Sequence, residues 1–499
     1  KMNNNPLINR PKHKHGAIDF DAIKLEHFMP ALNHAINTAE YKLQQIKNNP
    51  SQPNFKNTLV PMETCSELMT TVASVYFNLM GAESDNKFKE LAQEISPKLS
   101  AFHNSVLMDA ELFKRVKYVF DNKDSENLTI EENRIVEESY KDFTLNGALL
   151  SSSKKEKVKK IDEELSKISP KFSQNTLNAT NEFTYYTEDQ SELNGIPELI
   201  KNQAKELAIS KNKNNGWMLS LQMPCYIPVM QYAKDRKIRE MMFKEFGKIA
   251  FGGKFDNQEI IKKIVKLRFQ KAKILGYKDH ADYTLQKRMA QNTENVMNFL
   301  NRLYDVYYPA AKKELQEIKE LAKKDNIDEM QSWDFAYYSE KLKKQKFDFD
   351  QEELRPYFKV ENVINGIFKV AELMYGLQFK EVYDIPVYHK DVRVFEVYEK
   401  DNTFVSLFYI DLHPRETKRG GAWMTEFRSQ GLFEGKIERP HVAIVCNLTP
   451  STKDNPSLLT FSEVETIFHE FGHALHGMLS NVTYSSLASP DVYWDFVEL

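Results

Sequence analysis

Apolar residues recur at helical spacing along most of the chain. A first run lies between Pro30, which is placed as a first helical residue would be, and the stop signal Asn48-Asn49-Pro50. Its members are three or four positions apart, which is the period of one helix face. They are Leu32, Ala35, Ile36, Ala39, Leu43 and Ile46. We therefore predict a helix that begins at Pro30.

Two later stretches combine the same period with many charged residues. Ser151-Ser152-Ser153 has the chemistry of an N-terminal cap and precedes a charged helix that we predict to run toward Pro170. Residues 234–326 are again helical in period and rich in Lys and Glu. No fixed-period repeat or low-complexity linker interrupts the chain. The pattern predicts a mainly α protein whose helices assemble in two lobes.

The region 385–448 has a different pattern, with β-branched and aromatic residues in short runs. Three runs predict strands, at residues 392–398, 404–410 and 441–446, with Asp401-Asn402 in the turn between the first two. A small sheet is therefore expected immediately before the histidine-rich segment described below.

Composition narrows the class of protein. The 499 residues are 41% hydrophobic, which is enough for a large core. Acidic and basic residues nearly balance, with a net charge of -3, so no general field attracts nucleic acid or an anionic membrane. No apolar run is long enough to cross a bilayer. We expect a monomer that binds neither nucleic acid nor membrane.

Cysteine usage indicates the compartment. Cys65, Cys225 and Cys446 are far apart and form no CxxC pair, so disulfides are not expected and each is predicted to be a buried apolar residue. We expect a cytoplasmic protein. The chain starts at Lys1, so a periplasmic or exported protein with a removed signal is the alternative. The basic cluster at residues 12–15 is expected to be disordered and solvated.

One five-residue motif carries metal chemistry. His469-Glu470-Phe471-Gly472-His473 has the form HExxH. Ser462 and Glu465 have the spacing of a capping box, which predicts that a helix starts there. Four residues turn a helix by about 400°, so the two imidazoles lie on one face, as two ligands of a tetrahedral zinc require. Glu470 would then lie at the flank and take the proton of the attacking water.

A third ligand has to come from elsewhere. A metzincin would have Gly and His where this chain has His476 and Leu479, so that class is excluded. The acids that follow are Asp491, Asp495 and Glu498, in a segment that reads as a helix with Pro490 at its first position. Their spacing puts all three on one face, so spacing alone does not choose among them. His476 is interpreted as a packing residue.

These residues resemble a known family. Residues 468–477 and 495–498 are similar to the thimet-oligopeptidase family of metallopeptidases, M3, and most similar to its bacterial dipeptidyl carboxypeptidase members. The resemblance extends over nearly the whole chain. It includes residues 20–28, 385–396 and 408–412, and residues 419–424, which bacterial oligopeptidase A shares.

The resemblance implies a set of roles. It implies that His469, His473 and Glu498 bind one Zn²⁺ and that Glu470 is the catalytic base. It selects Glu498, which spacing left open. Asp495 and Glu463 are expected to support the site by accepting hydrogen bonds behind the ligands.

The resemblance also implies a substrate and an architecture. Two helical lobes, with an N-terminal region at 16–225 and a catalytic region at 226–499, would enclose a deep channel for short unstructured peptides. The small sheet would line it, and an extended peptide could pair with an exposed strand edge. Gly420 and Gly421, followed by Ala422, would allow close approach of a peptide backbone, although an ordinary hairpin turn explains the glycines equally well.

The expected activity is zinc-dependent release of C-terminal dipeptides from oligopeptides. An internally cleaving oligopeptidase is the alternative within this class. The family continues beyond the last metal ligand into a segment that stabilises the tetrahedral intermediate, whereas this chain stops at Leu499. We therefore expect it to be part of a longer protein. A non-catalytic peptide-binding fragment is the alternative from another class.

Overall fold

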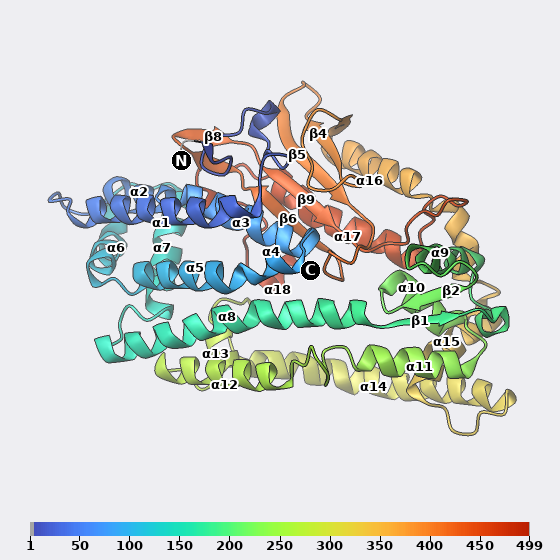
Figure 1. Cartoon of the computed structure of the whole chain (residues 1–499). Coiled ribbons are helices and arrows are strands. Elements are labelled where there is room, and N and C mark those ends of the chain that lie inside the picture. The colour runs from blue at the N-terminus through green and yellow to red at the C-terminus, as the bar shows by residue number, and fades with distance from the viewer. Residues whose placement is uncertain (1–3, 499) are drawn as a thin grey trace.

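The computed structural model describes residues 4–498 and is mainly helical (Figure 1). The helices up to residue 210 are α1 (Leu25–Lys47), α2 (Val60–Thr64), α3 (Glu67–Ala82), α4 (Asn86–Glu90), α5 (Ala92–Leu107), α6 (Ala110–Asn122), α7 (Ile130–Leu145), α8 (Ser152–Glu182) and α9 (Glu198–Ser210). Those that follow are α10 (Met223–Tyr232), α11 (Arg236–Gly247), α12 (Gln258–Ile274), α13 (His280–Leu285), α14 (Thr293–Lys324), α15 (Ser332–Phe347), α16 (Val360–Tyr375), α17 (Phe461–Met478) and α18 (Trp494–Val497). The prediction of a mainly α fold is confirmed.

A five-stranded sheet lies in the upper part of Figure 1. Its spatial order is β3-β4-β5-β9-β6, in which only β5 and β9 run parallel. The strands are β3 (Gln378–Val382), β4 (Arg393–Tyr398), β5 (Phe404–Asp411), β6 (Trp423–Arg428) and β9 (His441–Val445). Two further pairs are β1 (Thr184–Thr187) with β2 (Trp217–Ser220), and β7 (Gly431–Phe433) with β8 (Lys436–Glu438). The three predicted strands are β4, β5 and β9.

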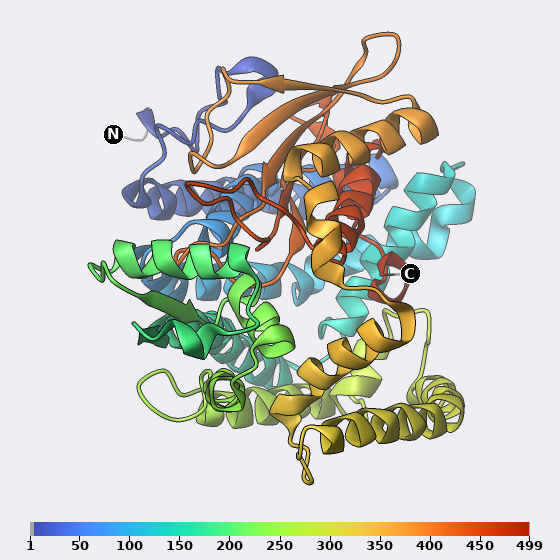
Figure 2. The same ribbon diagram turned by 90° about the vertical axis from the view of Figure 1, so that its right-hand side faces the viewer.

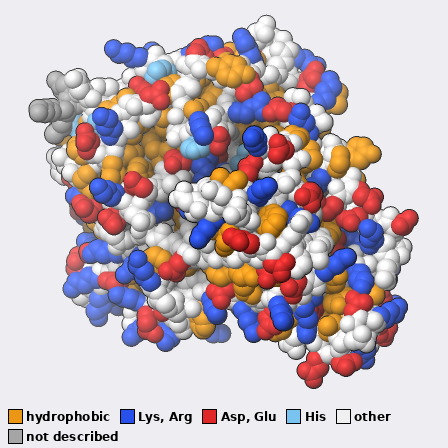
Figure 3. All heavy atoms as spheres, turned by 45° about the vertical axis from the view of Figure 1, so that its right-hand side comes forward, with side chains coloured by type: hydrophobic (Ala, Val, Ile, Leu, Met, Phe, Trp, Pro, Cys, Tyr) orange, Lys and Arg blue, Asp and Glu red, His pale blue; other side chains and the backbone are white. Residues whose placement is uncertain are grey.

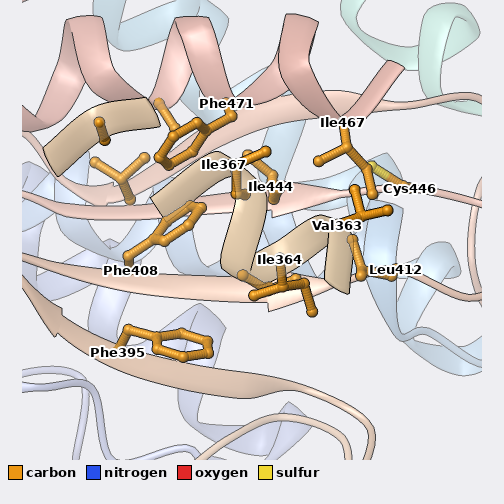
Figure 4. Packing of buried hydrophobic residues seen from close by; sticks show 14 of the residues in the cluster. Val363, Ile364, Ile367, Phe395, Phe408, Leu412, Ile444, Cys446, Ile467 and Phe471 are labelled. Atoms are coloured by element: carbon orange, nitrogen blue, oxygen red, sulfur yellow. The ribbon is translucent and has the colours of Figure 1, made fainter. Parts of the chain in front are cut away.

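Both faces of the sheet are buried. Alternate residues of β5 point to opposite sides, so Phe408 packs with α16 and α17 whereas Leu407 and Tyr409 pack with α1 and α3. Figure 4 shows the first of these cores, in which Ile367 of α16 and Phe471 of α17 lie over the sheet. The sheet thus fixes α17 on one face and ties the catalytic region to the N-terminal helices on the other.

The long helix α8 crosses the molecule between this upper part and the helices below it. It packs against α5 on one side and α12 on the other. Figure 2 shows the helices coloured green and yellow beneath the sheet. The boundary between residues 225 and 226 stays a prediction. The core on the α1–α3 side contains residues from both of the predicted regions.

Several local predictions differ from the structure. The helix α1 begins at Leu25, five residues before the expected start, and contains Pro30 internally. The charged helix α8 does follow Ser151, but it continues past Pro170 to Glu182. The strands β3 and β6 were not predicted, because neither has a run of β-branched residues.

The basic cluster near the N-terminus is ordered, contrary to expectation. The ring of His15 stacks on Phe404 with 3.7 Å between centroids, and its Nε2 lies 3.2 Å from a carboxylate oxygen of Glu396. Lys14 donates to the same carboxylate, whose side chain is fully buried. A buried carboxylate requires such partners, so it holds the segment in place.

All three cysteines are free, as predicted, and Cys65 and Cys446 are buried whereas Cys225 is partly exposed. Among residues 4–498, no helix has both the length and the apolar character needed to cross a membrane. Acidic and basic side chains are interspersed over the face in Figure 3, whose surface is hollowed near its centre.

Candidate metal centre

The helix α17 begins two residues earlier than the sequence indicated. Thr460 is its N-cap and Glu463 occupies the third helical position, and the two form the reciprocal capping box predicted for Ser462 and Glu465. The carboxylate of Glu463 also accepts a hydrogen bond from the Thr449 hydroxyl, at 2.7 Å. These contacts anchor the start of the helix and fix its rotation over the sheet. They hold the Glu463 carboxylate at the start of the helix, where it bonds to Thr449 and Thr460. The predicted hydrogen bonds from the metal ligands to Glu463 are not found among the described residues.

Three ligand atoms converge at the open side of α17. The Nε2 atoms of His469 and His473 are 3.1 Å apart, and the two rings are nearly perpendicular. One carboxylate oxygen of Glu498 lies 3.2 Å from the first Nε2 and 3.5 Å from the second. Among the described residues, this is the one group of three or more His, Cys, Asp or Glu side chains suited to a metal.

The three distances fit a tetrahedral ion. Zinc bonds to nitrogen and oxygen are about 2.0–2.1 Å long, so the edges of such a tetrahedron measure roughly 3.3–3.4 Å. The triangle formed by His469, His473 and Glu498 has edges of 3.1, 3.2 and 3.5 Å. The three side chains therefore match three corners of a tetrahedral zinc site.

Glu470 lies beside the histidines on the same helix, at the edge of its buried side. Its residue is only 6% exposed. Burial raises the pKa of its carboxyl, the two neighbouring histidines lower it, and Glu498 raises it further. A carboxylate whose pKa is raised is a stronger proton acceptor.

Glu498 reaches the site from a short helix rather than the longer one predicted. The helix α18 comprises four residues with Tyr493 as its N-cap, so Pro490 and Asp491 precede it. Both carboxylate oxygens of Asp495 accept backbone N–H groups, from Met289 and Ala290, at 2.9 Å each. Asp495 therefore anchors α18 to the loop before α14. The predicted contact between Asp495 and an imidazole is not found among the described residues.

His476 is partly buried, as its interpretation as a packing residue requires. Burial is the main cause that lowers its pKa, and the neighbouring His473 adds to it.

A glycine-containing loop lies at the start of β6, a strand on which α17 packs. The side-chain amide of Asn447 donates to the carbonyls of Arg419 and Gly421, at 2.9 and 2.6 Å. Gly421 has φ of +91°, which a residue with a side chain rarely adopts. Farther along β6, Ser74 and Asn78 of α3 donate to the carbonyl of Glu426. These contacts cover part of the strand edge and leave the loop end open.

The loop borders a cavity of about 490 Å³. Its walls come from α8, α10 and α11, and the side chains are largely apolar. Gly420 and Gly421 line it, whereas Ala422 packs against the core beneath. The lining includes Phe172, Leu177, Leu221, Met223, Phe246 and Ile249.

A buried ion network that the sequence did not indicate supports this loop. The ammonium of Lys418 is completely buried, and it lies 2.8 Å from the carboxylate of Asp411 and 2.8 Å from the carbonyl of Cys446. Arg415 binds both oxygens of the same carboxylate at 2.7 Å. No local motif links these positions, so only the fold reveals them. Asn447 likewise carried no sequence signal.

A fold with HExxH histidines on one helix and a carboxylate from the next defines a metallopeptidase. Comparison with known proteins is consistent with this. Residues 229–499 match the model of peptidase family M3, and residues 32–155 match that of the neurolysin/thimet oligopeptidase N-terminal domain. The chain belongs to peptidase family M3, whose members are zinc metalloenzymes.

The relatives have two different names. Oligopeptidase A of Escherichia coli is 33% identical over 488 residues, which cover 96% of this chain and 72% of the relative. Dipeptidyl carboxypeptidase of the same species is 32% identical over 497 residues, which cover 99% of this chain and 73% of the relative. Saccharolysin of Saccharomyces cerevisiae is 31% identical, with 90% of this chain and 64% of the relative covered. The similarity supports peptide hydrolysis and does not decide which bond is cut.

Proposed function

We propose that this chain is a zinc-dependent peptidyl-dipeptidase, which removes dipeptides from the C-termini of short peptides. The observation that supports the proposal most strongly is the triangle of ligand atoms from His469, His473 and Glu498, whose edges match a tetrahedral zinc site. The triangle combines two imidazoles and a carboxylate, which is a donor set typical of catalytic zinc in peptidases.

Each residue has a defined task in this mechanism. A zinc ion held by the two histidines and Glu498 would polarise the scissile carbonyl and lower the pKa of a water molecule. Glu470 removes a proton from the attacking water and delivers it to the nitrogen of the departing amine. The buried position of Glu470 keeps its carboxyl poorly solvated, which favours accepting that proton.

Metal analysis and one isosteric variant test the metal and base assignments. We expect about one zinc per chain in the full gene product, and a loss of zinc in His473→Ala. Glu470→Gln should retain zinc and lose activity by at least a hundredfold. Glu465→Gln is the matched control, because Glu465 is exposed on the same helix. Protein that lacks zinc after purification in metal-replete buffer would contradict the assignment.

Mass analysis of fragments tests the specificity. A peptidyl-dipeptidase releases dipeptides from the C-terminus of every accepted peptide in a defined set. An oligopeptidase that cuts internal bonds is the second candidate, favoured by the similar identity to oligopeptidase A. Internal fragments that appear before any dipeptide would favour this second candidate while the zinc assignment stands.

A further inference from the structure

The loop from Arg419 to Ala422 directs backbone N–H groups away from Asn447. A trans peptide unit holds its carbonyl and its N–H on opposite sides. The carbonyl of Arg419 shares a unit with the N–H of Gly420, and the carbonyl of Gly421 shares one with the N–H of Ala422. Asn447 holds both carbonyls, at 2.9 and 2.6 Å. Both N–H groups therefore point toward the side of the loop opposite Asn447.

These donors have no acceptor within the described part of the chain. The N–H of Arg419 donates to the carbonyl of Gly81 at 2.7 Å, but no such bond is found for the N–H groups of Gly420, Gly421 or Ala422. A Cβ added at either glycine would meet no heavy atom within 4 Å. The loop thus presents unpaired donors beside open space. Consecutive backbone N–H groups in such a turn form a concave site for anions.

Arg419 adds a cation without a carboxylate partner. Its guanidinium lies over the ring of Trp423, 4.2 Å from the centroid, and no ion pair with an acid of residues 4–498 involves it. The nearby Glu416 is paired with Lys211 at 2.6 Å. Arg419 is exposed, so its guanidinium is accessible to an anionic partner.

Three other cations near the sheet are paired with carboxylates. Arg393 binds Glu381 and Glu361, each at 2.7 Å. Arg415 and Lys418 share the carboxylate of Asp411. Of Arg393, Arg415, Lys418 and Arg419, only Arg419 has no carboxylate partner among residues 4–498.

We propose that the loop Arg419–Ala422 binds the free C-terminal carboxylate of a peptide whose last side chain is apolar and enters the adjoining cavity. The N–H groups of Gly420 and Ala422 and the guanidinium of Arg419 supply the donors, a pairing suited to a carboxylate. The apolar lining of the cavity favours a last residue such as phenylalanine or leucine. The inference rests on the proposed peptidase function, and it names the group by which the substrate is recognised.

Three peptides that differ only at the C-terminus test the site. The first ends in phenylalanine with a free carboxylate, the second is its amide, and the third is an amide that ends in glutamate. The wild-type enzyme should cleave the first with the highest kcat/KM. In Arg419→Met, which keeps an apolar stem over Trp423, the preference for the free acid over the amide should fall by about ten- to hundredfold. The change should lie mainly in KM, because the carboxylate is bound before and during reaction.

Controls separate this inference from the proposed function. Arg302→Met removes an exposed guanidinium from α14, outside the cavity lining, and should leave the preference unchanged. Arg419→Lys should retain part of the preference. If wild-type enzyme cleaves none of the peptides, the peptidase assignment is wrong. If it prefers the free acid and Arg419→Met keeps the same preference, only the site at Arg419 is wrong.

A measurement on wild-type enzyme covers the case in which the variant does not fold. The free dipeptide with C-terminal phenylalanine should inhibit at least tenfold more strongly than its amide. Equal inhibition by the two would overturn the proposal. Equal cleavage of the free acid and the glutamate-ending amide would show that any carboxylate at this end satisfies the site, and would overturn the terminal assignment.

Discussion

A buried carboxyl under the metal-binding helix should make the stability of the protein depend on pH. Glu426 of β6 lies where Gly477 of α17 passes over the sheet, and a Cβ at Gly477 would come within 2.7 Å of its Oε1. That oxygen is buried without a hydrogen-bond partner in the described structure, while Ser429 donates to the other oxygen at 2.7 Å. Burial is the main cause that raises the pKa of Glu426 to about 7, and Asp491 adds to it.

The magnitude and sign follow from that shift. The ordinary value is 4.5, so the unfolded chain ionises at a pH where the folded protein still holds the proton. The contribution of protonated Glu426 to the free energy of unfolding is fully present below pH 4.5 and is lost as the pH rises through about 7. The raised pKa therefore lowers the free energy of unfolding by roughly 3 kcal/mol at pH 8.

The variant Glu426→Gln removes the titration and keeps the shape. Its amide can face Ser429, and its uncharged head suits the buried position. We expect it to be more stable than wild type by roughly 2–3 kcal/mol at pH 8, and by little at pH 5. Denaturant unfolding of both proteins between pH 5 and 8 measures this. Parallel pH curves for the two proteins would refute the reasoning, whatever their absolute stabilities.

Three further outcomes are expected. Thr460→Ala removes the cap of α17 and should lower stability by about 1 kcal/mol in denaturant unfolding, whereas Thr460→Ser should retain most of it. Asp334→Ala leaves the buried guanidinium of Arg239 and the partly exposed one of Arg236 without their carboxylate and should cost about 3–5 kcal/mol; an unchanged unfolding midpoint would contradict this role. Removing metal with a chelator should abolish activity and lower Tm, and added zinc should restore both; a Tm indifferent to zinc would argue against binding at His469.

The sequence predicted those features that local pattern determines. The spacing of His469 and His473 predicted two side chains on one helix face, and the β-branched runs predicted β4, β5 and β9. The choice of Glu498 came from family resemblance, because the assumed helical spacing placed Asp491 and Asp495 equally well. The structure shows why spacing was insufficient: the segment is a four-residue helix, and Asp491 precedes it.

Tertiary contacts explain what the sequence did not predict. Nothing local marks Asn447 as the residue that orients the glycine loop, since its two acceptors lie 26 and 28 positions away. The cap of α17 was misplaced because Ser462 and Glu465 satisfy the same pattern as Thr460 and Glu463. The pair at Thr460 has the added hydrogen bonds from Thr449, which lies outside the helix. The second buried face of the sheet likewise depends on helices hundreds of residues away.

The helix α17 has an apolar side and a side that carries the histidines, and Glu470 lies at the border between them. Ile467, one turn before Glu470, and Phe471, next to it in the chain, are buried and pack on the sheet. Selection for a tighter core here would therefore also act on the position of a proton acceptor. Variants chosen only for heat resistance at these two positions should differ in turnover number, so thermal tolerance and catalytic rate cannot evolve independently along this helix.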